Sequence, residues 1–126
     1  MNNIHPTILR CYGITKDPET NDFMMVMKYA NNGNFRQYLN NNFNSLSWKK
    51  KLSNLRIIAL GLSKIHDKGL IHHDFHCGNM LQVGNCTTIT DLGLCQPANV
   101  KSSQNEYEKQ VYGVLPYVAP EVLRGK

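Results

Sequence analysis

The chain has 126 residues, of which 41% are hydrophobic, so it can form one folded domain and is not a disordered tail. Its 14 Lys and Arg against 9 Asp and Glu give a net charge of +5, without the runs of like charge that indicate nucleic acid. The longest apolar run spans residues 57–62, whereas a bilayer span needs about 18, so we expect no membrane contact and a cytoplasmic protein. The four cysteines form no C-x-x-C pair and are expected to be reduced thiols.

A β-hairpin is predicted near the N-terminus. Residues 7–14 alternate loosely between apolar and polar types, and residues 22–29 contain the apolar run Phe23–Met27. The polar segment 16–21 between them has the composition of a turn, so the two strands should pair. We expect Cys11, in the first strand, to be a small core residue.

Two helices are predicted next, a short one over residues 35–40 and a long one over residues 47–68. Ser47 suits the N-cap of the long helix, and Gly69 suits a left-handed residue at its C-terminal end. Lysines 49–51 oppose the helix dipole, so we interpret them as a solvated face with no stabilising role. The apolar stripe of the long helix is Leu52, Leu55, Ile58 or Ala59, Leu62 and Ile65.

Two short strands, 80–83 and 87–90, are predicted to form a second hairpin around Gly84-Asn85. The stretch 94–119 shows no clear periodicity and is predicted to be a loop. A loop of this length in a compact domain is usually functional or disordered.

Three short clusters of residues carry chemistry. They are His72-His73-Asp74-Phe75-His76-Cys77-Gly78-Asn79, Asp91-Leu92-Gly93 and Ala119-Pro120-Glu121. In this order, with a hairpin between the first two, they resemble the catalytic loop (H-R-D-x-x-x-x-N), the D-F-G motif and the A-P-E motif of protein kinases. Residues 5–9 and 25–30 resemble the kinase strands that lead to the hinge. The chain is therefore identified as a partial, eukaryotic-type protein kinase domain with an α+β fold, similar to tyrosine-kinase-like and other members.

The resemblance implies two parts of a kinase domain. Residues 1–30 would be a remnant of the N-terminal lobe with two strands and the hinge, and residues 31–126 a portion of the helical C-terminal lobe. The implied reaction is transfer of a phosphoryl group from ATP to a Ser, Thr or Tyr hydroxyl of a protein, with Mg²⁺ as the metal. The implied partners are a protein substrate or a partner kinase.

The resemblance also assigns roles in the transfer. Asp74 would accept the proton of the substrate hydroxyl, and His76 stands where serine/threonine kinases carry a lysine that faces the transferred phosphate. A histidine is only partly charged at pH 7, so transfer should be slower or more dependent on pH. Asn79 completes the catalytic set and, together with Asp91, would offer Mg²⁺ the oxygen ligands that it prefers.

The nucleotide base and the activation segment are assigned in the same way. Met27 resembles the gatekeeper, Lys28 and Ala30 belong to the hinge that contacts adenine, and Leu81 would pack beneath the purine. Glu121 closes the activation segment, which begins at Asp91. The candidate phosphorylation sites in this segment are Ser102, Ser103, Tyr107 and Tyr112.

The sequence also departs from the kinase pattern. His73 replaces the usual arginine, which weakens the expected clamp on a phosphorylated activation loop, and Leu92 and Val114 replace a phenylalanine and a threonine. The 126 residues contain no G-x-G-x-x-G loop and no V-A-I-K lysine, so we expect a fragment that is inactive by itself. The strand over residues 23–29 should then expose an apolar edge.

Other interpretations remain open. A pseudokinase-type interaction module would have the same motifs without activity. A small-molecule kinase of the aminoglycoside or choline kinase type would share H-x-D-x-H-x-x-N, although Ala119-Pro120-Glu121 favours a protein kinase. A zinc site at the cluster of histidines and Cys77 is disfavoured because no second pair of ligands lies at short spacing. We expect His72 to be structural and to pack in the core beneath Leu92.

Overall fold

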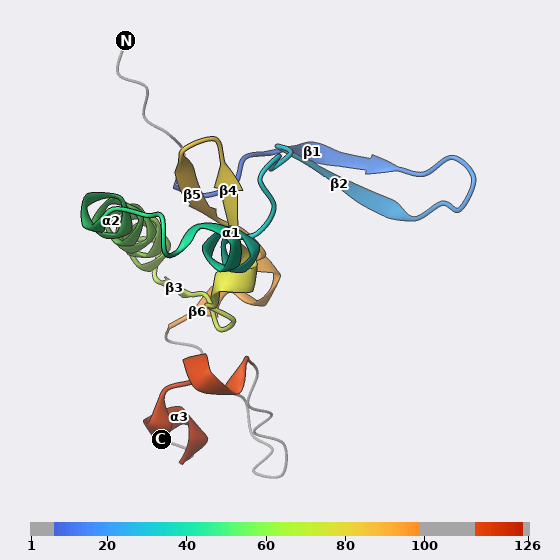
Figure 1. Ribbon diagram of the computed structural model, residues 1–126. Helices are drawn as coiled ribbons and strands as arrows, with labels where there is room; N and C mark the ends of the chain where they lie inside the picture. The colour runs from blue at the N-terminus through green and yellow to red at the C-terminus, as the bar shows by residue number, and fades with distance from the viewer. Residues whose placement is uncertain (1–6, 99–112, 125–126) are drawn as a thin grey trace.

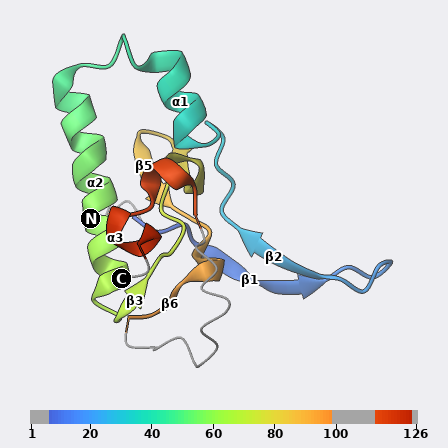
Figure 2. The same ribbon diagram turned by 90° about the horizontal axis from the view of Figure 1, so that it is seen from below.

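A computed structural model describes residues 7–98 and 113–124. Three two-stranded antiparallel sheets, β1–β2, β3–β6 and β4–β5, are combined with the helices α1, α2 and α3. Figure 1 shows α2 beside the β4–β5 hairpin and the β1–β2 hairpin extending away from both, an arrangement that Figure 2 repeats from below. In the described part of the chain, no helix combines the length and the apolar character needed to cross a membrane. All four cysteines are free thiols.

The first hairpin confirms the prediction. Strands β1 (Cys11–Lys16) and β2 (Phe23–Met27) pair antiparallel, with a bulge between Cys11 and Gly13. In the turn between the strands, the carboxylate of Asp17 accepts hydrogen bonds from two backbone amides, Glu19 N at 2.8 Å and Thr20 N at 3.2 Å. The predicted core position of Cys11 is wrong, because its side chain is exposed on a strand with no further layer against it.

The first strand also begins later than predicted because residues 7–9 join a different sheet. Leu9 N donates to Ile89 O at 2.8 Å, and Ile89 N donates to Thr7 O at 2.9 Å. These residues therefore run beside β5. Every residue of β1 and β2 is exposed, including the apolar run of β2, in which Phe23 is 80% exposed. This agrees with the predicted apolar edge.

Helix α1 (Phe35–Asn42) begins at the predicted residue, and α2 (Trp48–His66) begins directly after its predicted N-cap, Ser47. The side chain of Asn34 accepts from Gln37 N at 2.9 Å and the Gln37 side chain accepts from Asn34 N at 3.1 Å, which forms a capping box. Ser47 caps α2 by accepting from Lys50 N. At the other end, Gly69 has φ +69°, the left-handed conformation that favours glycine.

The buried face of α2 matches the predicted stripe only in part, since Ile65 is buried and Ile58 and Leu62 are half-buried. Asn54, Gly61 and Ile65 are its buried residues, whereas Leu52 and Leu55 are 59% and 60% exposed. The reason is the close approach of β5. A Cβ on Gly61 would lie 2.7 Å from Ile89 Cδ1, so the backbone of α2 itself packs on this strand. Spacings of seven and four residues place the other two buried residues on the same helix face.

Two of the three lysines at the start of α2, Lys50 and Lys51, contact other side chains or backbone, contrary to the prediction of a solvated face, whereas Lys49 is exposed as predicted. Lys50 Nζ donates to Asn85 O in the turn of the second hairpin at 2.7 Å. Lys51 Nζ lies 3.7 Å from the ring centroid of Phe43 and 5.6 Å from that of Trp48. The long side chains of Lys50 and Lys51 extend to the second hairpin and to Phe43, respectively. Their contacts are therefore determined by these neighbours rather than by the helix dipole.

The second hairpin forms as predicted, from β4 (Met80–Val83) and β5 (Cys86–Ile89). Its central side chains make a partly polar core, in which buried Thr87 Oγ1 donates to Gln82 Oε1 at 3.0 Å. Strand β3 (Leu70–Ile71) pairs with β6 (Gln96–Pro97), a strand that the sequence did not predict. The short elements are the 3₁₀ turns η1 (Cys77–Asn79), η2 (Leu92–Leu94) and η3 (Leu115–Tyr117), and the one-turn helix α3 (Pro120–Leu123).

Candidate functional site

The 72–79 loop connects β3 to β4, and buried His72 anchors its start. The ring of His72 is 2% exposed, and its Nε2 donates to Thr90 O at 3.1 Å. Its Nδ1 accepts from Asp74 N at 3.4 Å, and its ring packs edge-on against Phe75. His72 therefore has the structural role that the sequence predicted, and the described contacts are with Thr90, Asp74 and Phe75.

Both oxygens of the Asp74 carboxylate are oriented by the loop that carries it. Asn79 Nδ2 donates to Asp74 Oδ2 at 2.9 Å and to Asp74 O at 3.1 Å. His76 Nε2 lies 3.4 Å from Asp74 Oδ1. The backbone of His73, just before Asp74, has φ +66°, a conformation that is uncommon outside glycine. The spacing of five residues thus brings the three predicted catalytic residues into direct contact.

The orientation of the His76 ring follows from its hydrogen bonds. His76 Nδ1 accepts from Gly78 N at 3.0 Å, which places the proton of the neutral ring on Nε2. Nε2 is also the ring nitrogen that lies near Asp74 Oδ1, at 3.4 Å. The side chains of His76 and Asp74 are 14% and 21% exposed, so both remain within reach of a substrate.

Asn79 and Asp91 are brought near each other by the backbone. Thr90 N donates to Asn79 O at 3.0 Å, so the residue before Asp91 is paired directly with Asn79. Asp91 is exposed, in a left-handed conformation at φ +57°, and its carboxylate caps no helix. Because the amide nitrogen of Asn79 is used by Asp74, its oxygen is left for a cation. These hard oxygen donors fit Mg²⁺.

Within residues 7–98 and 113–124, no group of three or more His, Cys, Asp or Glu side chains is arranged to hold a metal. His72 binds the backbone of Thr90, and His76 contacts Gly78 N and the Asp74 carboxylate.

The residues predicted to contact the nucleotide base lie on two elements. Met27, at the end of β2, is 44% exposed and pairs with Cys11, and Lys28 N donates to Arg10 O at 2.9 Å. After Ala30 the chain turns back to β4, where Gln82 N donates to Gly33 O at 2.9 Å and Leu81 bridges to Asn34. The hinge residues and Leu81 are thus joined through residues 33–34, and no direct contact between Met27 and Leu81 is described.

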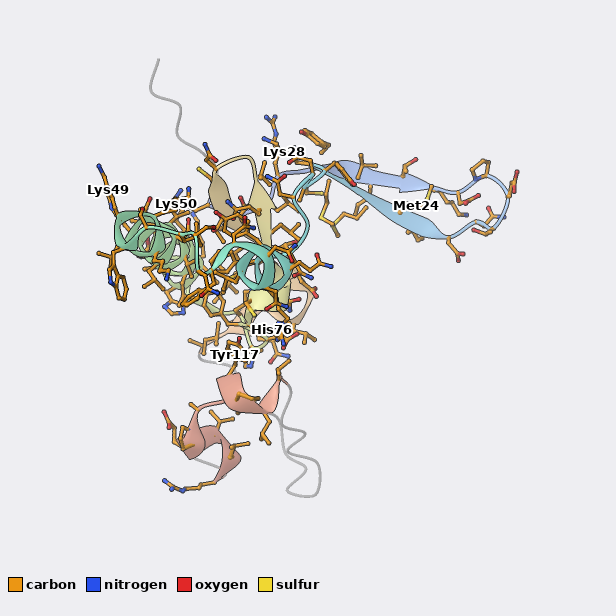
Figure 3. All side chains as sticks on the ribbon, in the orientation of Figure 1. Met24, Lys28, Lys49, Lys50, His76 and Tyr117 are labelled. Carbon is orange, nitrogen blue, oxygen red and sulfur yellow. The ribbon has the colours of Figure 1, made fainter. Side chains whose placement is uncertain are left out.

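The sequence singled out Cys77 only as a disfavoured zinc ligand and did not point to a contact between it and Tyr117. Tyr117, in η3, places its hydroxyl 3.1 Å from Cys77 Sγ and its ring 6.0 Å from the ring of His76. The hydrogen bond with Cys77 and partial burial raise the pKa of Tyr117. The only sequence signal was an aromatic residue following Pro116. Figure 3 shows the labelled side chains of His76 and Tyr117 close together.

The rest of the predicted activation segment is only partly described. Glu121 lies exposed in the first turn of α3, directly after Pro120. The candidate phosphorylation sites Ser102, Ser103, Tyr107 and Tyr112 lie outside the described residues.

A histidine-anchored loop with a paired aspartate and asparagine, followed by a β-hairpin that leads to a second aspartate, is the arrangement of the catalytic loop and metal motif in the protein kinase class. The family model for protein tyrosine and serine/threonine kinases matches residues 1–126. The chain therefore belongs to the protein kinase family, and its α+β fold is part of a protein kinase fold.

Individual relatives agree with this family assignment. The chain is 33% identical over 124 residues to dual specificity testis-specific protein kinase 2 of Homo sapiens, an alignment that covers 95% of the chain and 21% of that protein. It is 30% identical over 127 residues to an Aurora kinase of Debaryomyces hansenii, covering 97% of the chain and 29% of the relative. The chain thus spans less than a third of the length of these relatives.

Proposed function

We propose that this chain is the central part of a protein kinase catalytic domain, which transfers the γ-phosphoryl group of ATP to a hydroxyl group of a protein substrate. The supporting observation is the Asn79–Asp74 hydrogen bond of 2.9 Å. It holds the Asp74 carboxylate in a defined orientation next to the β4–β5 hairpin, which leads to Asp91. Phosphoryl transfer requires mainly positioning and neutralisation of charge; these residues would supply the positioning and would hold the cation that neutralises the charge.

In this proposal Asp74 receives the proton of the acceptor hydroxyl. Its Oδ2 is occupied by Asn79, so Oδ1, on the His76 side, is the oxygen left to accept the hydroxyl. His76 would donate through Nε2 to an oxygen bound beside Asp74. Mg²⁺, when bound, neutralises the phosphate charge, and Asn79 and Asp91 would hold it. Met27, Lys28, Ala30 and Leu81 would contact the adenine base.

We further propose that residues 1–30 belong to the N-terminal lobe and residues 31–126 to the C-terminal lobe. The isolated chain is expected to show no transfer, because no glycine-rich loop or strand lysine occurs among its residues to grip the phosphates. A cytoplasmic location agrees with the four free thiols. A non-catalytic module that binds a partner kinase is the second candidate, and it is favoured by the exposed apolar hairpin.

Phosphoryl transfer from labelled ATP to a generic protein substrate tests the proposal. The chain is assayed alone and after grafting between the N-terminal lobe and the C-terminal helices of a related kinase. We expect transfer only by the grafted chain, and its loss in Asp74→Asn. Asp67→Asn, an exposed carboxylate after α2, is the matched control and should retain transfer. Equal transfer by the grafted chain and its Asp74→Asn variant would contradict the catalytic role and favour the non-catalytic module.

A further inference from the structure

Within the described residues, the side-chain contacts between the 113–124 segment and the 72–79 loop are made by Tyr117. Its hydroxyl shares a 3.1 Å hydrogen bond with Cys77 Sγ, and its ring is tilted by 53° against the ring of His76. Gly113 lies against the same loop, since a Cβ there would be 3.5 Å from His73 O and 3.9 Å from Asp74 Oδ1. The segment therefore meets the loop where Asp74 is located, as Figure 3 illustrates for His76 and Tyr117.

The ring of His76 needs this contact because its polar anchor on one side is weak. Gly78 N holds Nδ1 at 3.0 Å, whereas Nε2 lies 3.4 Å from Asp74 Oδ1, an electrostatic contact longer than a typical hydrogen bond. A single strong hydrogen bond leaves an imidazole free to tilt. The Tyr117 ring, with its centroid 6.0 Å away, packs against the imidazole and limits that tilt.

We propose that Tyr117 is a positioning residue for phosphoryl transfer, which holds the His76 ring toward Asp74 and fixes the 113–124 segment beside the same carboxylate. The role rests on the function proposed above. A segment fixed in this place would guide the acceptor hydroxyl of a protein substrate to Asp74. Tyr117 would act on the carboxylate through His76 and through the placement of the acceptor, without touching the reacting atoms.

The hydrogen bond to Cys77 holds the phenol of Tyr117 in one orientation against the 72–79 loop. Tyr117 is 51% exposed, so burial alone does not hold the phenol in place. The phenol and the thiol both carry a proton and can both accept one, so either group can donate in this hydrogen bond. A serine at position 77 would preserve a partner for the phenol, whereas an alanine would remove it.

Amide hydrogen exchange of the 126-residue chain tests the coupling without any need for activity. In Tyr117→Ala the Gly78 amide, which binds His76 Nδ1, should exchange about threefold to tenfold faster, as should amides of the 113–124 segment. Cys77→Ala should accelerate exchange in the segment, and Cys77→Ser should restore it. Tyr12→Ala, a tyrosine of similar exposure on β1, is the control and should change neither region.

Unchanged exchange at Gly78 in Tyr117→Ala, or equal effects of Cys77→Ser and Cys77→Ala, would overturn the proposal. If circular dichroism shows that Tyr117→Ala does not fold, Tyr117→Phe decides: it keeps the ring, so only the 113–124 segment should exchange faster, and no change there overturns the role. In the grafted chain, Tyr117→Phe should raise KM for the acceptor more than KM for ATP, and an unchanged KM for the acceptor counts against positioning. Absence of transfer in every grafted variant would refute the proposed function, while the exchange data would still decide whether Tyr117 holds the loop.

Discussion

Replacing Gly61 with alanine should destabilise the protein, although alanine is the better helix former. Gly61 is buried in α2, and a Cβ there would lie 2.7 Å from Ile89 Cδ1 and 2.9 Å from Thr7 O. Ile89 is 1% exposed and has no free space to enter, and the Thr7 oxygen belongs to the backbone that pairs with Ile89 N. The new methyl group must therefore push β5 away from the helix.

Two opposing effects set the size of the change. Alanine in place of glycine gains about 1 kcal/mol in a helix. Overpacking a core costs about 1–3 kcal/mol, and the upper part of this range applies because a backbone oxygen cannot rotate away. We expect a net loss of about 1–2 kcal/mol in the free energy of unfolding.

Urea unfolding of the 126-residue chain, followed by far-ultraviolet circular dichroism, measures this loss. Ser63→Ala, on the exposed face of the same helix, is the control and should leave the stability equal or slightly higher. A Gly61→Ala variant as stable as the parent would refute the close packing of α2 on β5. The result matters for the site because β5 leads directly to Asp91.

Three further predictions concern a cap, a cation–π contact and a thiol. Ser47→Ala removes the acceptor of the Lys50 amide and should cost about 1 kcal/mol in urea unfolding, with Ser53→Ala as the neutral control. Lys51→Met should lower the free energy of unfolding by about 0.5–1 kcal/mol through loss of the contact with Phe43, whereas Lys49→Met should have little effect. Burial and the nearby charge of Asp91 raise the pKa of Cys95, so less thiolate is present at neutral pH and iodoacetamide should alkylate Cys95 more slowly than exposed Cys11. Equal rates for the two thiols would argue against that environment.

Local features of the fold could be predicted from the sequence because their causes are local. Turn residues between two apolar runs specified both hairpins, and Ser47 and Gly69 specified the ends of α2. The spacing of Asp74 and Asn79 matched the catalytic-loop motif, and the structure adds a hydrogen bond between them because both residues lie in one short loop.

The features that the sequence did not reveal depend on residues far apart in the chain. The exposed positions of Leu52 and Leu55 follow from the approach of β5 to Gly61, which no helical periodicity contains. Likewise, Cys77 and Tyr117 are 40 residues apart, and neither is unusual in its local sequence. Only the folded chain shows that these two side chains meet beside Asp74.

The rate of phosphoryl transfer by the grafted chain, divided by the rate of its Asp74→Asn variant, tests the central claim most directly. Positioned proton acceptors typically contribute 10²–10⁴-fold to a rate. We therefore predict a ratio of at least about 100, with the Asp67→Asn control at the parental rate. A ratio near one would contradict the account, because a carboxylate held by Asn79 and His76 would then have no part in the reaction.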